Sequence, residues 1–181
     1  MSAGRLTLIL GGARSGKSRF ALERARAAGS GVLFVATSEA GDADMADRIA
    51  RHRAERPAHW ETLEEPCALA AALEPRTTPP VVVVDCVTLW VTNLMLRPDA
   101  QWDSAVAELE AFLLWHERRG GERILVSNEV GLSVVPENAL ARRFQEWLGS
   151  FNQRLAAAAD EVYWMLAGLP VEVKSLVPKQ P

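Results

Sequence analysis

Residues 11–18 carry the most specific chemical signal in the sequence. They read GGARSGKS, which matches the phosphate-binding pattern G-x-x-x-x-G-K-[ST] without a gap. Glycines in such a loop let successive backbone N–H groups turn toward phosphate oxygens, and the following helix adds partial positive charge. The alternative is a glycine-rich turn that binds nothing, but the flanking strand and helix patterns disfavour it. The candidate nucleotide contacts are therefore Gly11, Gly12, Ala13, Arg14, Ser15, Gly16, Lys17 and Ser18.

Three residues have sharper expected roles in this nucleotide site. The ammonium group of Lys17 is expected to reach the β- and γ-phosphates as a catalytic cation, and the Ser18 hydroxyl to bind Mg²⁺. Asp85 ends the apolar run VVVVD and is the second expected Mg²⁺ ligand. The alternative for Asp85 is a strand-end residue that caps the next helix. The pattern favours a triphosphate bound together with Mg²⁺.

His52 lies in a second cluster that needs its own explanation. On a helix, Arg48, His52 and Arg56 fall on one face, because they are four residues apart. A neutral imidazole can attack phosphorus, and guanidinium groups can hold phosphates through paired hydrogen bonds. The alternative is a solvated charged helix face, and the residue types alone favour that alternative.

The pattern of apolar runs predicts the elements that position these residues. Two strong strand signals lie next to the chemistry, since 5–10 leads into the glycine-rich loop and 81–85 ends at Asp85. Strands that alternate with helices predict an α/β fold with a mainly parallel sheet and helices on both faces. Strands are also expected at 32–36, 123–127, 161–167 and 171–174, and helices at 17–28, 45–56, 66–74, 87–96, 137–159 and around 106–113.

Length and composition restrict the function classes. A chain of 181 residues fits one domain, 1–181, and 49% hydrophobic residues suffice for a full core. A net charge of -3 disfavours nucleic acid as the main partner. No apolar stretch reaches about 20 residues, so we expect no membrane insertion. Two cysteines without CxxC spacing, and no signal-peptide pattern, favour the reducing cytoplasm.

Several segments together resemble one known family, the bifunctional adenosylcobinamide kinases/adenosylcobinamide-phosphate guanylyltransferases of cobalamin biosynthesis. The resemblance runs from the first strand to about Gly168. The phosphate loop is generic, whereas the pattern around His52 and the block from NEVG to NQRLAAAADEV are far more specific. The segments are GGARSGKS, ATSE, M-x-x-RI-x-x-H-x-x-x-RP-x-x-W-x-T-x-E, DC-x-TLW-x-x-NL, NEVG, VPEN and NQRLAAAADEV.

The resemblance implies two reactions on a corrinoid substrate. The family phosphorylates the aminopropanol hydroxyl of adenosylcobinamide with ATP or GTP, and then transfers GMP from GTP to the new phosphate through a guanylylated histidine. That catalytic histidine falls on His52, in a RecA-like P-loop fold that assembles as a homotrimer. Asp85 stands where some relatives carry Glu. Besides the loop, the implied nucleotide contacts are Thr37, Ser38, Glu39, Arg53, Ala54, Glu55, Arg56, Glu64 and Asp85.

The two reactions attack different phosphorus atoms, so something must move between them. We expect the polar segment 37–57, which carries His52, to be a mobile flap. Two alternatives remain at this point: a P-loop small-molecule kinase without nucleotidyl transfer, and a RecA-like ATPase that binds DNA or a protein. Glu129 of NEVG is expected to support the metal site, to contact corrinoid amides or to be structural. His59, His116, Trp60 and Trp90 are expected to be structural.

Overall fold

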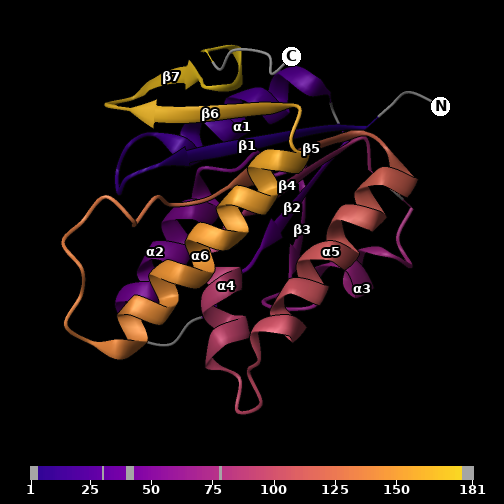
Figure 1. Cartoon of the computed structure of the whole chain (residues 1–181). Coiled ribbons are helices and arrows are strands. Elements are labelled where there is room, and N and C mark those ends of the chain that lie inside the picture. Colours follow the sequence, from indigo (N-terminus) through magenta and orange to yellow (C-terminus); the bar gives the residue numbers. More distant parts are fainter. Residues whose placement is uncertain (1–3, 30, 40–42, 78, 177–181) are drawn as a thin grey trace, which may run out of the picture.

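The computed structural model describes residues 4–29, 31–39, 43–77 and 79–176 (Figure 1). Within helix α2, the side chains of 43–46, 48 and 49 are also outside the described part, so residues 40–42 of the expected flap and the Arg48 side chain are not placed. The strands are β1 (Arg5–Gly11), β2 (Val32–Ala36), β3 (Glu61–Glu64), β4 (Val81–Asp85), β5 (Glu122–Val126), β6 (Glu161–Leu166) and β7 (Leu169–Glu172). The helices are α1 (Lys17–Ala28), α2 (Ala43–Ala54), α3 (Leu69–Leu73), α4 (Val87–Leu96), α5 (Trp102–Arg119), α6 (Ala139–Ala158) and the 3₁₀ turn η1 (Lys174–Leu176).

All seven strands form one sheet in the order β3-β2-β4-β5-β1-β6-β7. Every pairing is parallel except that of β6 with β7, so the sequence prediction of a mainly parallel α/β sheet is confirmed. Parallel strands end at the same edge of a sheet, which is where such folds bind ligands. Strand β5 lies between β1, which leads into the glycine-rich loop, and β4, which ends at Asp85.

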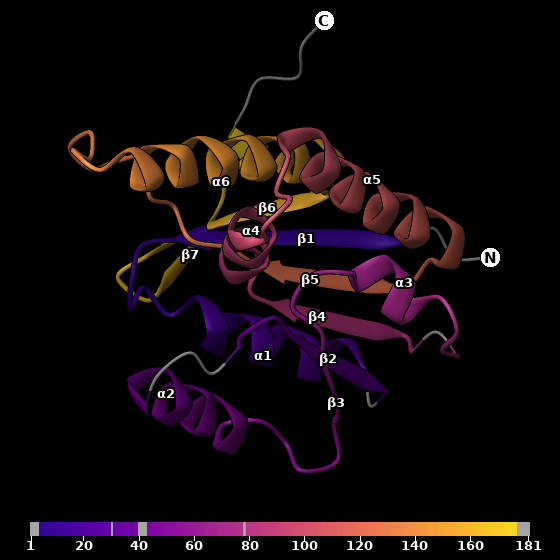
Figure 2. The same ribbon diagram turned by 90° about the horizontal axis from the view of Figure 1, so that it is seen from below.

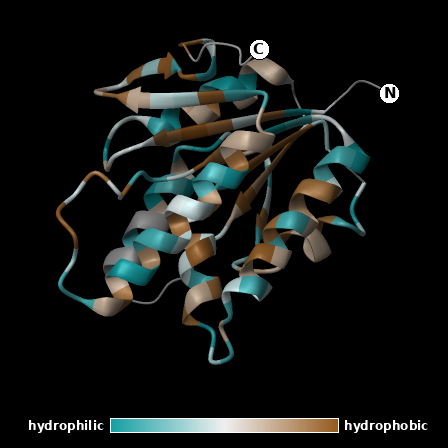
Figure 3. Cartoon of the chain, viewed as in Figure 1, coloured by the Kyte–Doolittle hydropathy of each residue, from teal (hydrophilic) through white to brown (hydrophobic). Residues whose placement is uncertain are grey.

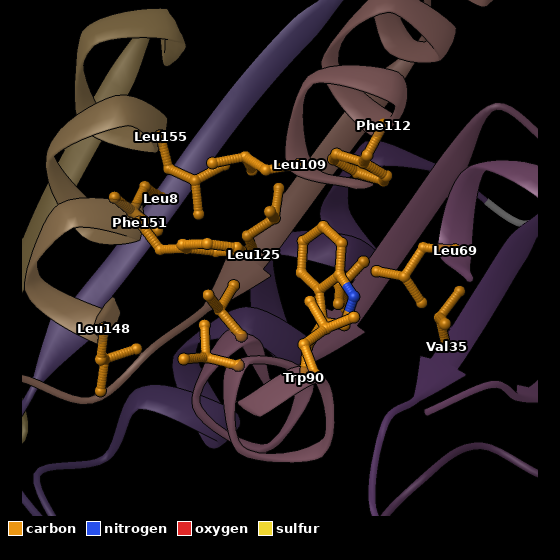
Figure 4. Packing of buried hydrophobic residues seen from close by; sticks show 14 of the residues in the cluster. Leu8, Val35, Leu69, Trp90, Leu109, Phe112, Leu125, Leu148, Phe151 and Leu155 are labelled. Atoms are coloured by element: carbon orange, nitrogen blue, oxygen red, sulfur yellow. The ribbon is translucent and has the colours of Figure 1, made fainter. Parts of the chain in front are cut away.

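Helices cover both faces of the sheet. Figure 2 shows α3, α4, α5 and α6 on one side and α1 and α2 on the other. Trp90 lies at the centre of the larger core, with no exposed surface, and its ring meets Phe112 and Phe151 edge to face at 5.9 and 5.7 Å (Figure 4). The strand interiors are correspondingly hydrophobic in Figure 3. Trp60 is also buried, so both tryptophans belong to the cores, as expected.

The structure differs from the predicted elements mainly at their ends. Strand β3 was not predicted, because ETLE is short and polar, yet it pairs in parallel with β2. The helix expected at 66–74 is only Leu69–Leu73, because the Glu65 carboxylate accepts hydrogen bonds from the backbone N–H groups of Cys67 and Ala68 and holds the preceding turn. The expected edge strand is found at Leu169–Glu172. Among the described residues, no helix is long and apolar enough to cross a bilayer.

Candidate active site

The glycine-rich loop joins the end of β1 to the start of α1, as the motif requires. A Cβ atom at Gly11 would come within 2.7 Å of Ser15 Oγ and 2.8 Å of the Met165 carbonyl oxygen, so a larger residue does not fit there. Gly16 has a φ of 93°, in the left-handed region that favours glycine. The two glycines therefore allow the tight curl that turns backbone N–H groups inward.

Lys17 is folded back over this loop. Its Nζ donates a hydrogen bond of 2.6 Å to the Gly12 carbonyl oxygen and lies 3.5 Å from Ser15 Oγ, and the residue is only 8% exposed. A buried ammonium group attached to the loop backbone is ready to meet phosphate oxygens without a large rearrangement. This arrangement fits the catalytic role that the motif predicts for Lys17.

A cavity of about 580 Å³ opens over the loop. It is bordered by the loop, by the C-terminal half of α2 and by the ends of β4 and β5. Residues from four separate parts of the sequence therefore face one space. The lining residues are Ala13, Arg14, Ser15, Gly16, Lys17, Ser18, Arg19, Arg51, His52, Glu55, Asp85, Val126 and Asn128.

His52 and Asp85 face one another across this cavity. Nδ1 of His52 lies 3.7 Å from Oδ2 of Asp85, which is close enough for charge attraction but too long for a direct hydrogen bond. The His52 side chain is 32% exposed and that of Asp85 is 13% exposed. His52 thus turns toward the phosphate loop, and its other ring nitrogen, Nε2, is the one that does not face the carboxylate.

A second hollow of about 420 Å³ lies beside the ends of β2 and β3. Arg53 borders it and pairs with Glu64 at 3.2 Å. The guanidinium group of Arg56 lies 3.6 Å from the centre of the Phe34 ring, and burial lowers the pKa of Arg56. Since His52 and Arg53 are consecutive, the last turn of α2 borders both cavities. The lining residues are Ala36, Ser38, Glu39, Arg53, Arg56, Glu64, Glu65 and Pro66.

The predicted nucleotide contacts therefore fall into groups. Residues 13–18, His52, Glu55 and Asp85 line the first cavity, and Ser38, Glu39, Arg53, Arg56 and Glu64 line the second. Gly11, Gly12, Thr37 and Ala54 line neither cavity.

Thr37 acts on the backbone next to Asp85. Its buried hydroxyl donates to the Cys86 carbonyl oxygen at 2.7 Å and accepts from the Cys86 N–H at 2.8 Å. In this structure the Thr37 side chain therefore fixes the chain that follows Asp85, so its contribution to the site is to hold that carboxylate in place.

The prediction that Arg56 shares a helix face with Arg48 and His52 is wrong. Helix α2 ends at Ala54, and Arg56 packs on Phe34 in the second hollow, away from the cavity that His52 lines. Pro57 accounts for the early end, because a residue before proline disfavours helical geometry. Arg51 lines the first cavity together with His52 instead.

Four residues of the first cavity were not predicted from the sequence: Arg19, Arg51, Val126 and Asn128. Ala36, Glu65 and Pro66 of the second hollow were not predicted either. The sequence does indicate Asn128, because this polar residue follows a predicted strand that ends at the same sheet edge as Asp85. Glu129, the next residue, lines neither cavity. Its carboxylate accepts a hydrogen bond from the Gly131 N–H at 2.7 Å and closes a local turn, so the structure gives it a structural role. His116 is buried, as expected for a structural histidine, whereas His59 is exposed.

The cavity offers donors that suit Mg²⁺. Ser18 supplies a hydroxyl oxygen and Asp85 a carboxylate, and both line the same space as the phosphate loop. Mg²⁺ prefers oxygen ligands and is commonly held by one or two protein groups together with substrate phosphates. Among the described residues, no group of three His, Cys, Asp or Glu side chains is placed to hold a metal.

Comparison with solved structures supports the fold. The RadB recombinase aligns with a TM-score of 0.51, covering 90% of this chain and 74% of that chain, at 15% sequence identity. At this identity the likeness concerns the fold alone, and it confirms the RecA-like α/β architecture.

Comparison with curated proteins supports the family. The bifunctional adenosylcobalamin biosynthesis protein CobP of Pseudomonas aeruginosa is 49% identical over 92% of this chain and 96% of its own. The proteins named CobU of Escherichia coli and Salmonella typhimurium are 41% and 40% identical, each over 93% of this chain and 99% of the relative. A family model described as cobinamide kinase / cobinamide phosphate guanyltransferase matches residues 7–173. The chain therefore belongs to the cobinamide kinase / cobinamide phosphate guanyltransferase family.

Proposed function

We propose that this chain is a bifunctional enzyme of cobalamin biosynthesis. It phosphorylates adenosylcobinamide with ATP or GTP, and then transfers GMP from GTP to adenosylcobinamide phosphate through a guanylylated His52. The observation that carries this proposal is that His52, Asp85 and the phosphate loop line one cavity. A simple kinase does not need a histidine in that position.

In the kinase reaction, the loop and Lys17 hold the phosphates of the nucleotide. The substrate hydroxyl attacks the γ-phosphorus while the bond to the β–γ bridging oxygen breaks, so a nucleoside diphosphate leaves and the hydroxyl proton is released. Positioning and charge neutralisation dominate such displacements. Mg²⁺ held by Ser18 and Asp85 would supply further positive charge to the phosphates when it is bound.

In the transferase reaction, a nitrogen of His52 attacks the α-phosphorus of GTP and pyrophosphate leaves. A phosphate oxygen of adenosylcobinamide phosphate then attacks the same phosphorus, which forms GDP-cobinamide and frees the imidazole. Because Nδ1 faces Asp85 at 3.7 Å, Nε2 is the nitrogen that is free to attack. A carboxylate beside Nδ1 favours the imidazolium character that develops during attack.

The second hollow is our proposed guanine site. Guanine presents two N–H donors on one edge, and the carboxylates of Glu39 and Glu64 are acceptors that line this hollow. This hollow lies next to the first cavity, because the last turn of α2 borders both. One GTP molecule could therefore place its base in the hollow and its α-phosphorus near His52.

We also propose a cytoplasmic homotrimer as the working assembly. The side chains of Leu132, Val134 and Val135 are 80%, 90% and 73% exposed on the segment between β5 and α6, and exposed apolar groups of this kind favour association. Light scattering of the purified protein is expected to give three times the chain mass; a monomeric mass would contradict the assembly but leave the chemistry untouched.

The proposal is tested with GTP labelled at the α-phosphate. The parent protein should acquire a label that is acid-labile and alkali-stable, as expected of a phosphorus–nitrogen bond. His52→Ala should lose this label and still phosphorylate adenosylcobinamide, whereas His59→Ala, at an exposed histidine outside both cavities, should behave like the parent. Phosphorylation without any label in the parent would leave a plain P-loop kinase, and tight DNA binding at physiological salt would favour the ATPase alternative.

A further inference from the structure

Asn128 differs from the other cavity residues in its hydrogen bonds. Both of its backbone polar groups are bonded to other side chains, whereas its side-chain amide is not bonded to a described residue. Its N–H donates to Thr88 Oγ1 at 2.9 Å, and its carbonyl oxygen accepts from Asn152 Nδ2 at 3.0 Å. Within the described part of the chain, no residue hydrogen-bonds its side-chain amide. Asn128 is one of the residues that line the cavity over the phosphate loop.

The groups that fix Asn128 form a buried polar network. Ser127 Oγ donates to Asn152 Oδ1 at 2.7 Å, which orients the amide so that Nδ2 points to the Asn128 carbonyl oxygen. Ser127 is fully buried, and Asn152 and Thr88 are 5% and 9% exposed. Burying polar groups is costly unless they are satisfied, and a fully satisfied network is rigid. This network therefore gives Asn128 one defined position.

The sheet places Asn128 between the glycine-rich loop and Asp85. Val126 of β5 pairs with Ile9 of β1 on one side and with Asp85 of β4 on the other. The ladder to β1 continues past the strand, since the Glu129 N–H donates to the Gly11 carbonyl oxygen at 3.2 Å. Asn128 thus lies beside the first glycine of the loop, between that loop and Asp85. A terminal phosphate that met both the loop and a Mg²⁺ on Asp85 would come close to this position.

We propose that Asn128 recognises the γ-phosphate: its Nδ2 donates a hydrogen bond to a terminal phosphate oxygen of the bound ATP or GTP. Asn152, with Ser127, is then a positioning residue that acts through Asn128. A neutral amide adds a directed donor without a further charge. Because this donor meets the γ-phosphate, which a diphosphate lacks, it distinguishes a triphosphate from a diphosphate. The inference rests on the proposed function to the extent that a nucleoside triphosphate occupies this loop.

The test compares triphosphate and diphosphate binding in the full-length protein. Asn128→Ala should weaken binding of a non-hydrolysable GTP analogue about 10- to 100-fold, as for a lost hydrogen bond to a charged group, and leave GDP binding within about threefold. Asn128→Asp, which is nearly isosteric, should weaken the triphosphate analogue more, because a carboxylate repels the γ-phosphate. Kinase kcat should fall in both variants.

Two further variants separate recognition from folding. Asn152→Ala should give a smaller loss of the same triphosphate-selective kind, whereas Asn138→Ala, which removes the cap of α6 where Oδ1 accepts from the Leu140 N–H at 2.8 Å, should leave the selectivity unchanged. Equal losses for GTP analogue and GDP in Asn128→Ala, or a lowered melting temperature with unchanged selectivity, would overturn the proposal. The binding ratio reports on Asn128 even if no corrinoid is phosphorylated, so the two proposals fail separately.

Discussion

At the scale of single residues, the site combines a buried cation, Lys17, with the proposed nucleophile, His52. Lys17 is held by the loop backbone and serves both proposed reactions, since both need the phosphates in place. His52 is partly exposed and is carried by a different element, α2, and in the proposed function it acts in the transferase reaction alone. Variants of Lys17 should therefore slow both reactions, whereas variants of His52 should slow the transferase reaction alone.

Lys17→Met should reduce both reactions, because the triphosphate loses its main charge partner. We expect kinase kcat and the rate of His52 labelling each to fall by about 10²- to 10³-fold, a typical effect of removing one preorganised electrostatic group. Steady-state kinase assays and α-labelled GTP measure the two rates. A loss confined to one reaction would show that the two steps do not share this phosphate site.

At the scale of elements, the larger core holds α4 against the sheet and so sets the position of the chain after Asp85. Trp90 of α4 also donates from Nε1 to the Cys67 carbonyl oxygen at 2.7 Å. Trp90→Phe keeps an aromatic ring but loses this hydrogen bond and leaves a cavity. The free energy of unfolding should therefore fall by about 2–4 kcal/mol. Urea denaturation measures this, and Trp102→Phe, at a partly buried tryptophan, is the milder comparison.

Helix α5 carries a histidine that should make stability depend on pH. Burial, and then the nearby Arg123, lower the pKa of His116 below its ordinary 6.5, and its Nδ1 has no hydrogen-bond partner within the described residues. Between pH 6.5 and the lower folded pKa of His116, the unfolded chain therefore binds more protons than the folded chain. The free energy of unfolding thus keeps the full contribution of neutral His116 above pH 6.5 and loses it as the pH falls toward the folded pKa.

His116→Leu should flatten the fall in melting temperature between pH 7.5 and pH 5.5. His59→Leu, at an exposed histidine, should leave the parent's pH dependence unchanged. An equally steep fall in His116→Leu and in the parent would contradict the assignment to this residue.

At the scale of the whole molecule, one sheet edge must present the same nucleotide to two different reactions. The γ-phosphorus reacts in one step and the α-phosphorus in the other, so either the nucleotide or the segment 37–57 shifts between them. The contacts of α2 with the rest of the described chain include an exposed hydrogen bond of 3.3 Å from Arg26 to the Glu55 carbonyl oxygen just after the helix, and the exposed pair of Arg53 with Glu64. Exposed contacts of this kind are weak.

Hydrogen exchange with and without GTP tests this flap. Backbone amides of α2 should become more protected when GTP and Mg²⁺ are added, while those of β4 and β5 should change little, because they are already buried. Equal protection of α2 in both states would contradict a mobile flap.

How far the sequence predicts this site depends on how local each feature is. The loop at 11–18 and Asp85 follow from contiguous motifs, and the parallel sheet follows from strong apolar runs. The approach of His52 to Asp85 joins residues 33 positions apart, and residue spacing does not predict it. The family resemblance implies a catalytic role for His52 but not this contact. Asn128 opens the NEVG segment, but the segment alone gives it no role, and its place between the glycine-rich loop and Asp85 appears only when β5 is seen between β1 and β4.

The proposed function depends above all on the guanylylation of His52. The sharpest measurement is mass spectrometry of the intact protein after incubation with GTP and Mg²⁺, followed by peptide mapping. We expect an added guanylyl group on the peptide that contains His52, absent from His52→Ala and discharged when adenosylcobinamide phosphate is added. No adduct under these conditions, or an adduct that persists in His52→Ala, would contradict it.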